Sequence, residues 1–345
     1  MGRESVLEQI RKAKDALGKN LVILGHHYQT DDVIRFADYR GDSLELSRVA
    51  ASSRDAAYIV FCGVDFMAES AALLCDARQK VFIPSGEAIC PMAAMADREQ
   101  AEEAWERLTE IWGEDIVPVT YQNSSAELKA FCGEMGGAVC TSSSAGAVFR
   151  WAFEQRGHIL FFPDEHLGRN TALSLGLAAE EIAVWDPEGP SDQHAGMKDS
   201  RVVVWKGYCR VHTRFTVDQV QQARHKYPEA RVIVHPECTA EVVAASDESG
   251  STSYIVRVVE EAAAGSTFVI GTEKNLVSRL AAEHPEKTVV PLAPSVCGAM
   301  SRITPQRLLA VLEAILEGRA DDAVSVPAET IAGATVALDR MLAVH

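Results

Sequence analysis

Residues 21–29, LVILGHHYQ, form a short apolar run that ends in two histidines, a tyrosine and a glutamine. Two later stretches share this form: IVPVTYQN at residues 116–123 and RVIVHPEC at residues 231–238. Short apolar runs bounded by polar residues are typical of buried strands, and ligands of parallel α/β sheets bind beyond the carboxyl ends of the strands. The three stretches therefore predict three copies of one unit, each opening on a strand whose polar end faces a binding site.

Each copy continues through three more apolar segments with helical patterns between them, which is typical of βαβ units and parallel sheets. The second segment carries a Ser/Thr turn, the third ends in an acid-bearing turn, and the fourth ends in a cysteine. We therefore expect an α/β fold of three domains with about four parallel strands each. Three such domains facing one centre would bring together the cysteines that end the copies, Cys90, Cys209 and Cys297.

The spacing of the copies also predicts the domain boundaries. In the C-terminal tail, Thr304 is the expected N-cap of a helix, with Pro305 at its first position and Gly318 as its stop. We expect this tail to lie back on the first domain. The expected domains are residues 1–92 with 298–345, residues 93–209, and residues 210–297.

Composition narrows the class of protein. The chain has 49 acidic and 33 basic residues, a net charge of −16, which argues against a nucleic-acid partner because such a protein would present a basic stripe. The chain has no run of about 18 apolar residues and no apolar signal segment, so we expect a cytoplasmic protein without a membrane span. The eight cysteines are dispersed and include no CxxC pair, so reduced thiols, some of them metal ligands, are favoured over a disulfide framework.

The three cysteines at equivalent positions allow two interpretations. Taken singly, each would be a small core residue, since cysteine without a disulfide is among the most buried residue types. Taken together, they indicate a metal site, either a mononuclear zinc site or an iron–sulfur cluster held by thiolates. Three thiolates on a four-iron cluster would leave one iron open to act as a Lewis acid.

Polar residues at the strand ends are the candidates for catalysis and binding. His26 and Tyr28 suit proton transfer and hydrogen bonding, and Glu237 beside His235 suits general acid–base chemistry. The alternatives are a solvent-facing turn for the first pair and a helix-dipole contact for Glu237. The Ser/Thr turns are expected to cap helices, to bind an anion at the helix N-terminus, or both. The remaining candidates are Ser43, Tyr121, Asn123, Ser142, His212, Ser251 and Thr252.

At this point the sequence resembles the quinolinate synthase (NadA) family over essentially its whole length. Any one of the shared motifs would be weak evidence, but their ordered combination is specific. The motifs are GHHYQ, ADYRGDSLELSR, CGVDFMAESA, ICPMA, YQNSSAELKA, VCTSSSA, PDEHLGRN, KGYCRVH, VHPEC, GSTSYI, IGTE and SVCGAM.

The resemblance implies three pseudo-threefold-related αβα sandwich domains with the active site at the centre. It implies that Cys90, Cys209 and Cys297 ligate a [4Fe-4S] cluster whose fourth iron is open to substrate. It implies the condensation of iminoaspartate with dihydroxyacetone phosphate to quinolinate, with loss of phosphate and water, in NAD biosynthesis. An L-aspartate oxidase is the expected source of iminoaspartate.

The resemblance also implies residue roles. The catalytic candidates are Glu237, Tyr28, His26 and His212. The substrate-binding candidates are His26, Ser43, Tyr121, Asn123, Ser142, His235, Glu237, Ser251 and Thr252.

The sequence departs from the family pattern in three places. YQN stands where YVN is more usual, and Ser144 stands where asparagine is common, which could alter a polar contact. SVCGAMSRI has only Cys297, so we expect no regulatory disulfide there. Two alternative functions are a zinc-dependent hydrolase using the same three cysteines and a non-catalytic small-molecule binding protein.

Overall fold

The computed structural model describes residues 2–319 and 322–344. The chain forms two compact units. The first contains residues 1–90 and 296–327, and the second contains residues 91–295 and 328–345. All strand pairs in the three sheets are parallel, as the sequence predicts.

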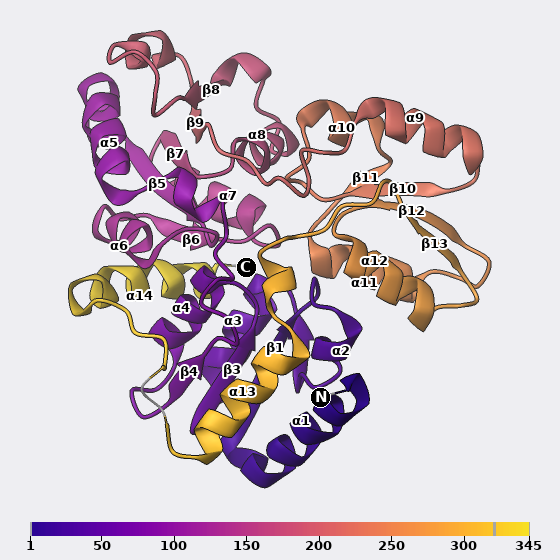
Figure 1. The fold of residues 1–345 in the computed structure, drawn as a ribbon. Helices are drawn as coiled ribbons and strands as arrows, with labels where there is room; N and C mark the ends of the chain where they lie inside the picture. The colour runs from indigo at the N-terminus through magenta and orange to yellow at the C-terminus, as the bar shows by residue number, and fades with distance from the viewer. Residues whose placement is uncertain (1, 320–321, 345) are drawn as a thin grey trace. The chain divides into compact units, whose positions relative to one another are not determined.

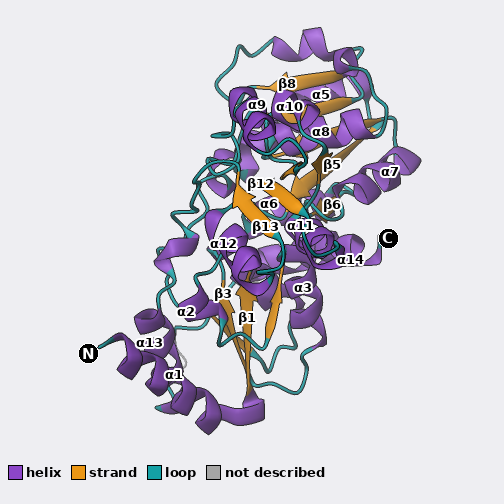
Figure 2. Ribbon diagram, turned by 90° about the vertical axis from the view of Figure 1, so that its right-hand side faces the viewer, coloured by secondary structure: helices purple, strands orange, loops and turns teal. Residues whose placement is uncertain are grey.

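The first unit is built around a four-stranded sheet in the order β2-β1-β3-β4. Helices α1 and α13 pack together on one face of this sheet, and α3 and α4 lie on the other (Figures 1 and 2). The strands are β1 (Leu21–His26), β2 (Tyr39–Gly41), β3 (Tyr58–Cys62) and β4 (Lys80–Phe82). The helices are α1 (Arg3–Leu17), α2 (Asp31–Ile34), α3 (Ser43–Ser52), α4 (Asp65–Leu74) and α13 (Pro305–Leu316).

The second unit contains two sheets, in the orders β6-β5-β7-β9-β8 and β11-β10-β12-β13. Its strands are β5 (Ile116–Tyr121), β6 (Ala138–Cys140), β7 (His158–Phe162), β8 (Ile182–Trp185), β9 (Val202–Trp205), β10 (Arg231–Val234), β11 (Glu248–Ser249), β12 (Thr267–Gly271) and β13 (Thr288–Pro291). Its helices are α5 (Arg98–Trp112), α6 (Ala126–Glu134), α7 (Ala145–Gln155), α8 (Glu165–Ser174), α9 (Val217–Lys226), α10 (Ala240–Ala245), α11 (Thr252–Glu261), α12 (Lys274–Glu283) and α14 (Ala328–Ala343).

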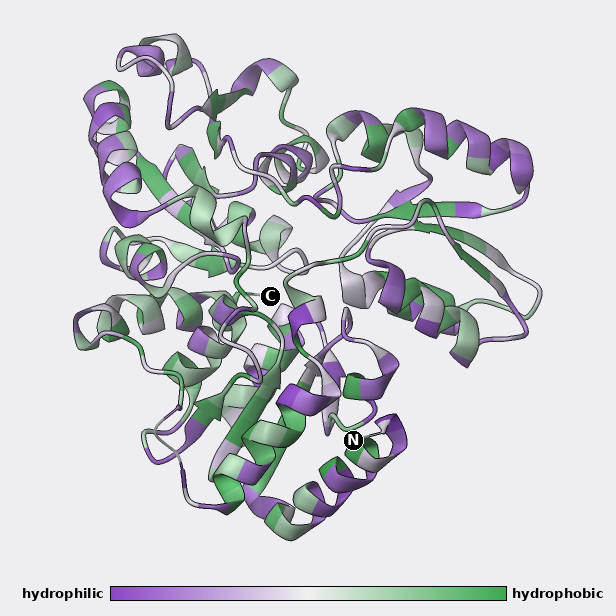
Figure 3. Cartoon of the chain, in the orientation of Figure 1, coloured by the Kyte–Doolittle hydropathy of each residue, from purple (hydrophilic) through white to green (hydrophobic). Residues whose placement is uncertain are grey.

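The three sheets repeat one topology, because in each the opening strand lies between the second and third strands of its copy. This confirms three small parallel sheets interleaved with helices. The first and third sheets have the four strands expected, and the middle sheet has a fifth, because β8 adds an edge strand beside β9. Apolar residues fill the strands, whereas surface helices such as α9 are largely hydrophilic (Figure 3). Among the described residues, no helix is long and apolar enough to cross a membrane.

The C-terminal tail divides between the two units. Helix α13 begins as predicted, with the Thr304 side chain accepting a hydrogen bond from the Arg307 N–H and with Pro305 at the first helical position. Gly318 follows the helix with a φ of 73°, which suits a glycine stop. Helix α14, in contrast, packs against α6 and β6 of the second unit, so the expectation that the whole tail lies on the first domain is wrong for this helix.

Close backbone contact holds α14 on α6. A Cβ atom at Gly133 would lie 1.9 Å from the carbonyl oxygen of Gly333, so only glycine fits at this crossing. The Arg340 guanidinium donates to the carbonyl oxygen of Gly137 at 2.6 Å and adds a polar contact between the two segments. Helix α14 is therefore built into the second unit.

We expect Gly133→Ala to lower the free energy of unfolding by about 1–3 kcal/mol, because the added methyl group must push α14 away. Gly146→Ala is the matched control, since a Cβ atom there meets only Arg150 Nη1, at 3.7 Å. That control should stabilise the protein by at most about 1 kcal/mol through the unfolded state. Thermal unfolding checks both variants, and equal midpoints for the two would contradict the described packing.

Candidate active site

In the first unit, the predicted residues gather at the end of β1. His26 is the last residue of β1 and is buried, and its Nδ1 accepts a hydrogen bond from the Tyr28 N–H at 3.1 Å. The two rings meet edge to face with centroids 4.7 Å apart. Ser43 opens α3, but Asp42 caps this helix and bonds the N–H groups of Leu44 and Glu45. The turn after β1 therefore fixes the His26 ring against Tyr28.

Two of the predicted cysteine ligands also belong to the first unit. The sequence suggested that these cysteines end strands. In the structure they lie instead in loops that follow the fourth strand of their copies. The Cys90 N–H donates to Asp65 Oδ1 at 3.0 Å, which ties this loop to the start of α4. The Cys297 carbonyl accepts from the Ser301 hydroxyl at 2.9 Å, so a short turn holds the second loop.

Exposure separates the candidate ligands from most of the other cysteines. Cys90, Cys209 and Cys297 are partly exposed, whereas Cys62, Cys132, Cys140 and Cys238 are buried. Burial raises the pKa of Cys62 to about 12 and also raises the pKa of Cys75 to about 12, so neither thiol ionises readily. Thiolates are the metal-binding form of cysteine. The chemistry of the donor set, three thiols at equivalent positions of the copies, therefore fits metal ligands.

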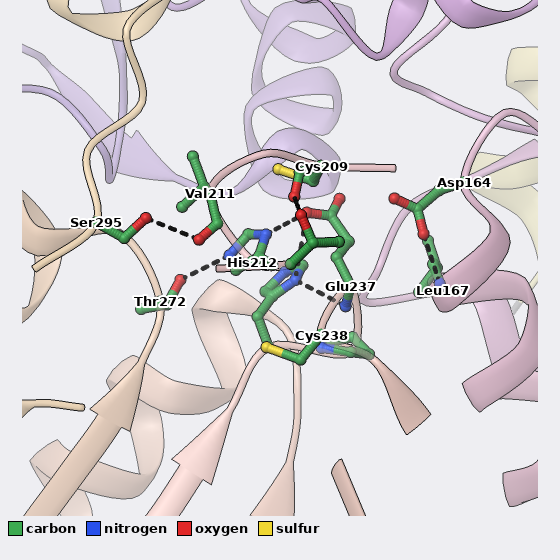
Figure 4. A network of polar contacts seen from close by, with 12 residues as sticks. Asp164, Leu167, Cys209, Val211, His212, Glu237, Cys238, Thr272 and Ser295 are labelled. Atoms are coloured by element: carbon green, nitrogen blue, oxygen red, sulfur yellow. Dashed lines mark hydrogen bonds and ion pairs between the residues drawn. The ribbon is translucent and has the colours of Figure 1, made fainter. Parts of the chain in front are cut away.

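The second unit brings together His212, His235 and Glu237, which are all buried. Figure 4 shows His212 beside Glu237. Glu237 Oε2 lies 2.5 Å from His212 Nδ1 and 3.6 Å from His235 Nδ1. The two imidazole rings are stacked with centroids 4.3 Å apart. Thr272 Oγ1 lies 3.2 Å from His212 Nε2 and so fixes the far side of that ring. The sequence predicted these histidines and Glu237 as site residues, and the fold places them in one cluster.

The charges in this cluster follow from burial and proximity. Burial and the neighbouring His212 lower the pKa of His235 to about 3, so this imidazole is neutral near pH 7. Burial opposes ionisation of Glu237, but the two histidines and hydrogen bonds from His212 and Tyr121 outweigh it and lower the pKa of the carboxyl group. Glu237 is therefore held as a buried carboxylate with a ring nitrogen of His212 at hydrogen-bond distance.

The thiol of Cys209 lies beside this pair. Its Sγ atom, a ring nitrogen of His212 and a carboxylate oxygen of Glu237 are all within 4.8 Å of one another, a spacing at which they could hold a metal ion. His212 and Glu237 already bind each other, which favours an acid–base pair next to a thiolate that binds the metal.

Tyr121 and Asn123 follow β5 in a firmly held turn. The Tyr121 carbonyl accepts from the Ser124 hydroxyl at 2.8 Å, and the buried Lys129 ammonium donates to the Ser124 carbonyl. Asn123 Oδ1 is buried and has no hydrogen-bond partner among the described residues. A buried amide oxygen without a partner is costly unless a ligand or water satisfies it. Asn123 therefore presents a buried acceptor that a bound molecule could satisfy.

The Ser/Thr turns of the second and third copies border one cavity of about 210 Å³. Ser142 lines it from the N-terminal side of α7, and Ser249 and Gly250 line it from the turn before α11. Ser251 caps α11 by accepting from the Tyr254 N–H, which confirms the capping interpretation for this residue. Ser144, the departure from the family pattern, accepts from the Thr141 N–H at 2.9 Å and so closes its own turn.

Two residues near the cluster were not singled out from the sequence. Asn170 on α8 donates to the carbonyl oxygens of Pro236 and Cys238, both at 2.8 Å, and so clamps the loop that carries Glu237. Asp164 caps the same helix and lies on the other side of Glu237 (Figure 4). Asp164 could have been predicted from the sequence, because an acidic residue follows the third strand of each copy.

Known proteins resemble this chain along its whole length. A family model described as Quinolinate synthetase A protein matches residues 8–343. A quinolinate synthase of Bacillus cereus (strain G9842) is 48% identical over 345 residues, covering 99% of this chain and 94% of that protein. A quinolinate synthase of Bacillus anthracis (strain A0248) has the same identity and coverage. The resemblance found in the motifs is confirmed, and the chain belongs to the quinolinate synthetase A family.

Proposed function

We propose that this protein is a quinolinate synthase, which condenses iminoaspartate with dihydroxyacetone phosphate to quinolinate with loss of phosphate and water. The observation that carries the proposal is the buried His212–Glu237 pair beside the Cys209 thiol, in a chain that the family model matches over residues 8–343. The product would enter NAD biosynthesis. L-Aspartate oxidase is the proposed source of the imine, and the cytoplasm the proposed location.

Cys90, Cys209 and Cys297 would hold a [4Fe-4S] cluster. Their equivalent positions in the three copies support this assignment, because iron–sulfur clusters are held by cysteine thiolates. When bound, the cluster supplies a Lewis acid at an iron that no cysteine ligates. The pseudo-threefold arrangement around a central site is part of the same proposal.

Proton transfer falls to the residues around Glu237. Its carboxylate would accept a proton from a substrate carbon or nitrogen and pass it on to a leaving oxygen, with His212 as its partner. Tyr121 donates a hydrogen bond to Glu237 and so restrains that side chain. Tyr28 and His26 are fixed edge to face at the end of β1. They would carry the proton transfers that Glu237 does not. Burial of these groups excludes bulk water that would hydrolyse an imine.

Substrate anions would bind without a basic patch. The net charge of −16 requires local positive potential for carboxylates and phosphate, and helix N-termini provide it through N–H groups and the helix dipole. The proposed binding groups are Ser43 at α3, Ser142 near α7, and Ser251 and Thr252 at α11, together with His235. Asn123 adds the buried acceptor described above.

The test is to purify the protein without oxygen, quantify iron, sulfide and zinc, and assay quinolinate from iminoaspartate and dihydroxyacetone phosphate. We expect about four irons and four sulfides per chain, a broad visible absorption, and product formation that depends on both substrates. A colourless zinc protein with hydrolytic activity would support the hydrolase instead. A protein that binds small molecules without turnover, even after anaerobic reconstitution, would support a non-catalytic binding function.

A further inference from the structure

Asp164 is a buried carboxyl group that capping alone does not explain. It follows β7 and caps α8, where its Oδ1 accepts from the Leu167 N–H at 2.6 Å. The side chain is fully buried, and Oδ2 has no hydrogen-bond partner among the described residues. An N-cap residue needs only one oxygen, and its other oxygen normally remains in water. The burial of Asp164 Oδ2 therefore requires another reason.

Asp97 shows the ordinary arrangement in the same unit. Its Oδ1 accepts from the Gln100 N–H at 2.8 Å at the start of α5, and the residue is exposed. Capping is thus served equally well by a carboxyl group in water. Burial of a second carboxylate oxygen is unfavourable unless the group is paired or carries a proton.

The orientation of Asp164 indicates its partner. Its unpaired oxygen is turned toward the Glu237 carboxyl group, on the side away from His212 (Figure 4). Two buried carboxyl groups at close range do not both ionise, because each negative charge disfavours the other. One of the two must therefore keep its proton.

The surroundings decide which one keeps it. Glu237 has two histidines and the Tyr121 hydroxyl, all of which favour its charged form. Asp164 has only backbone N–H groups of Leu167 and His166, and burial and the Glu237 charge together raise the pKa of Asp164 well above its usual range. The proton therefore belongs on Asp164, and an O–H group on Oδ2 would be directed to the Glu237 side.

We propose that Asp164 is a positioning residue of the active site, a neutral carboxylic acid whose Oδ2 hydroxyl faces Glu237 and holds that carboxylate beside His212. The inference rests on the proposed acid–base role of Glu237. In this arrangement Glu237 is the general base, and Asp164 on one side and His212 on the other hold its carboxylate in place. Asp164 does not itself touch substrate.

The test compares two replacements that both keep the helix cap. Asp164→Asn retains an acceptor for the Leu167 N–H and a donor toward Glu237, whereas Asp164→Ser retains only the cap, as Ser251 does on α11. We expect Asp164→Asn to keep kcat within about threefold, and Asp164→Ser to lower kcat by about 10–100-fold with KM little changed, because misplaced catalytic groups cost rate. Asp97→Ser is the matched cap control and should leave kcat unchanged.

Equal kcat for Asp164→Ser and wild type, or equal losses in both Asp164 variants at unchanged thermal midpoints, would overturn the proposal. A parallel Glu237→Gln variant distinguishes failure of the Asp164 proposal from failure of the proposed role of Glu237. A fully active Glu237→Gln enzyme would contradict the role of Glu237 itself. A second readout does not depend on turnover. The infrared difference spectrum of cluster-containing wild type minus Asp164→Asn should show the C=O band of a protonated carboxylic acid at pH 7, and its absence would refute the neutral Asp164 even if Asp164→Ser fails to fold.

Discussion

Cys209→Ala is expected to give a folded protein that retains no iron–sulfur cluster and forms no measurable quinolinate. Two thiolates would hold a four-iron cluster too weakly to survive purification, because iron–sulfur clusters depend on their cysteine ligands. Iron and sulfide analysis, the visible spectrum and the quinolinate assay measure the result on anaerobically prepared protein. Cys75→Ala is the control, since Cys75 is also partly exposed but lies at no equivalent position of the three copies.

Cys297→Ala extends this experiment because it separates the two donor sets that include Cys209. A cluster held by three cysteines is lost in both variants. A metal ion held by Cys209, His212 and Glu237 is lost in Cys209→Ala but retained in Cys297→Ala, because Cys297 is not part of that group. Metal retained at the wild-type level in both variants would contradict any role for these thiols as ligands.

Glu237→Gln is expected to lower kcat by about 10²–10⁴-fold, the usual contribution of a positioned acid or base. Glutamine keeps the size of the side chain and can still bond His212 and Tyr121, but it cannot take up a proton. KM should change far less than kcat, because the lost function belongs to the transition state. Steady-state kinetics with both substrates, with the cluster content matched to wild type, measure this split.

Glu248→Gln is the control for that experiment. Glu248 lies on β11 of the third sheet and bonds the Tyr254 hydroxyl at 2.6 Å, away from the histidine pair. The Glu248→Gln substitution removes one carboxylate from the third sheet and leaves the proposed acid–base group unchanged. A Glu237→Gln enzyme with kcat within tenfold of wild type would contradict the assignment of the proton transfer to Glu237.

Much of the fold was predictable because parallel strands are buried on both faces and therefore read as continuous apolar runs. The edge strand β8 was not predicted, because its sequence IAVW is short. Its central residues Ala183 and Val184 are only partly buried, as an edge position allows. The packing of α14 could not be read either. Its amphipathic pattern shows that a face is buried but does not say against which sheet, and the answer depends on the close approach of Gly133 and Gly333.

The site was predictable to the level of residue types at strand ends. The pairing of His212 with Glu237 was not, since it depends on how the loop after β9 meets the loop after β10. Asp164 was overlooked because an aspartate before a helix is fully explained as a cap. The repeat carried more information, because acids recur after the third strand of every copy, at Asp65, Asp164 and Glu273. In the structure, one fixes the Cys90 loop and the other two are wholly buried caps.

The division of the C-terminal tail has a consequence for synthesis on the ribosome. Helix α1 packs against α13, and α6 with β6 packs against α14. The first unit therefore lacks a covering helix until residue 316 is translated, and the second until residue 343. At about 5–20 residues per second, the nascent chain leaves the apolar side of α6 uncovered for roughly ten seconds or more. Domains of many proteins fold in turn as they emerge, but here the second unit cannot complete its core until the residues of α14 follow those of the first unit. A chain released from a ribosome that stalls near residue 325 would contain α13 but not α14. Its second unit would be unfinished and a substrate for chaperones and proteases.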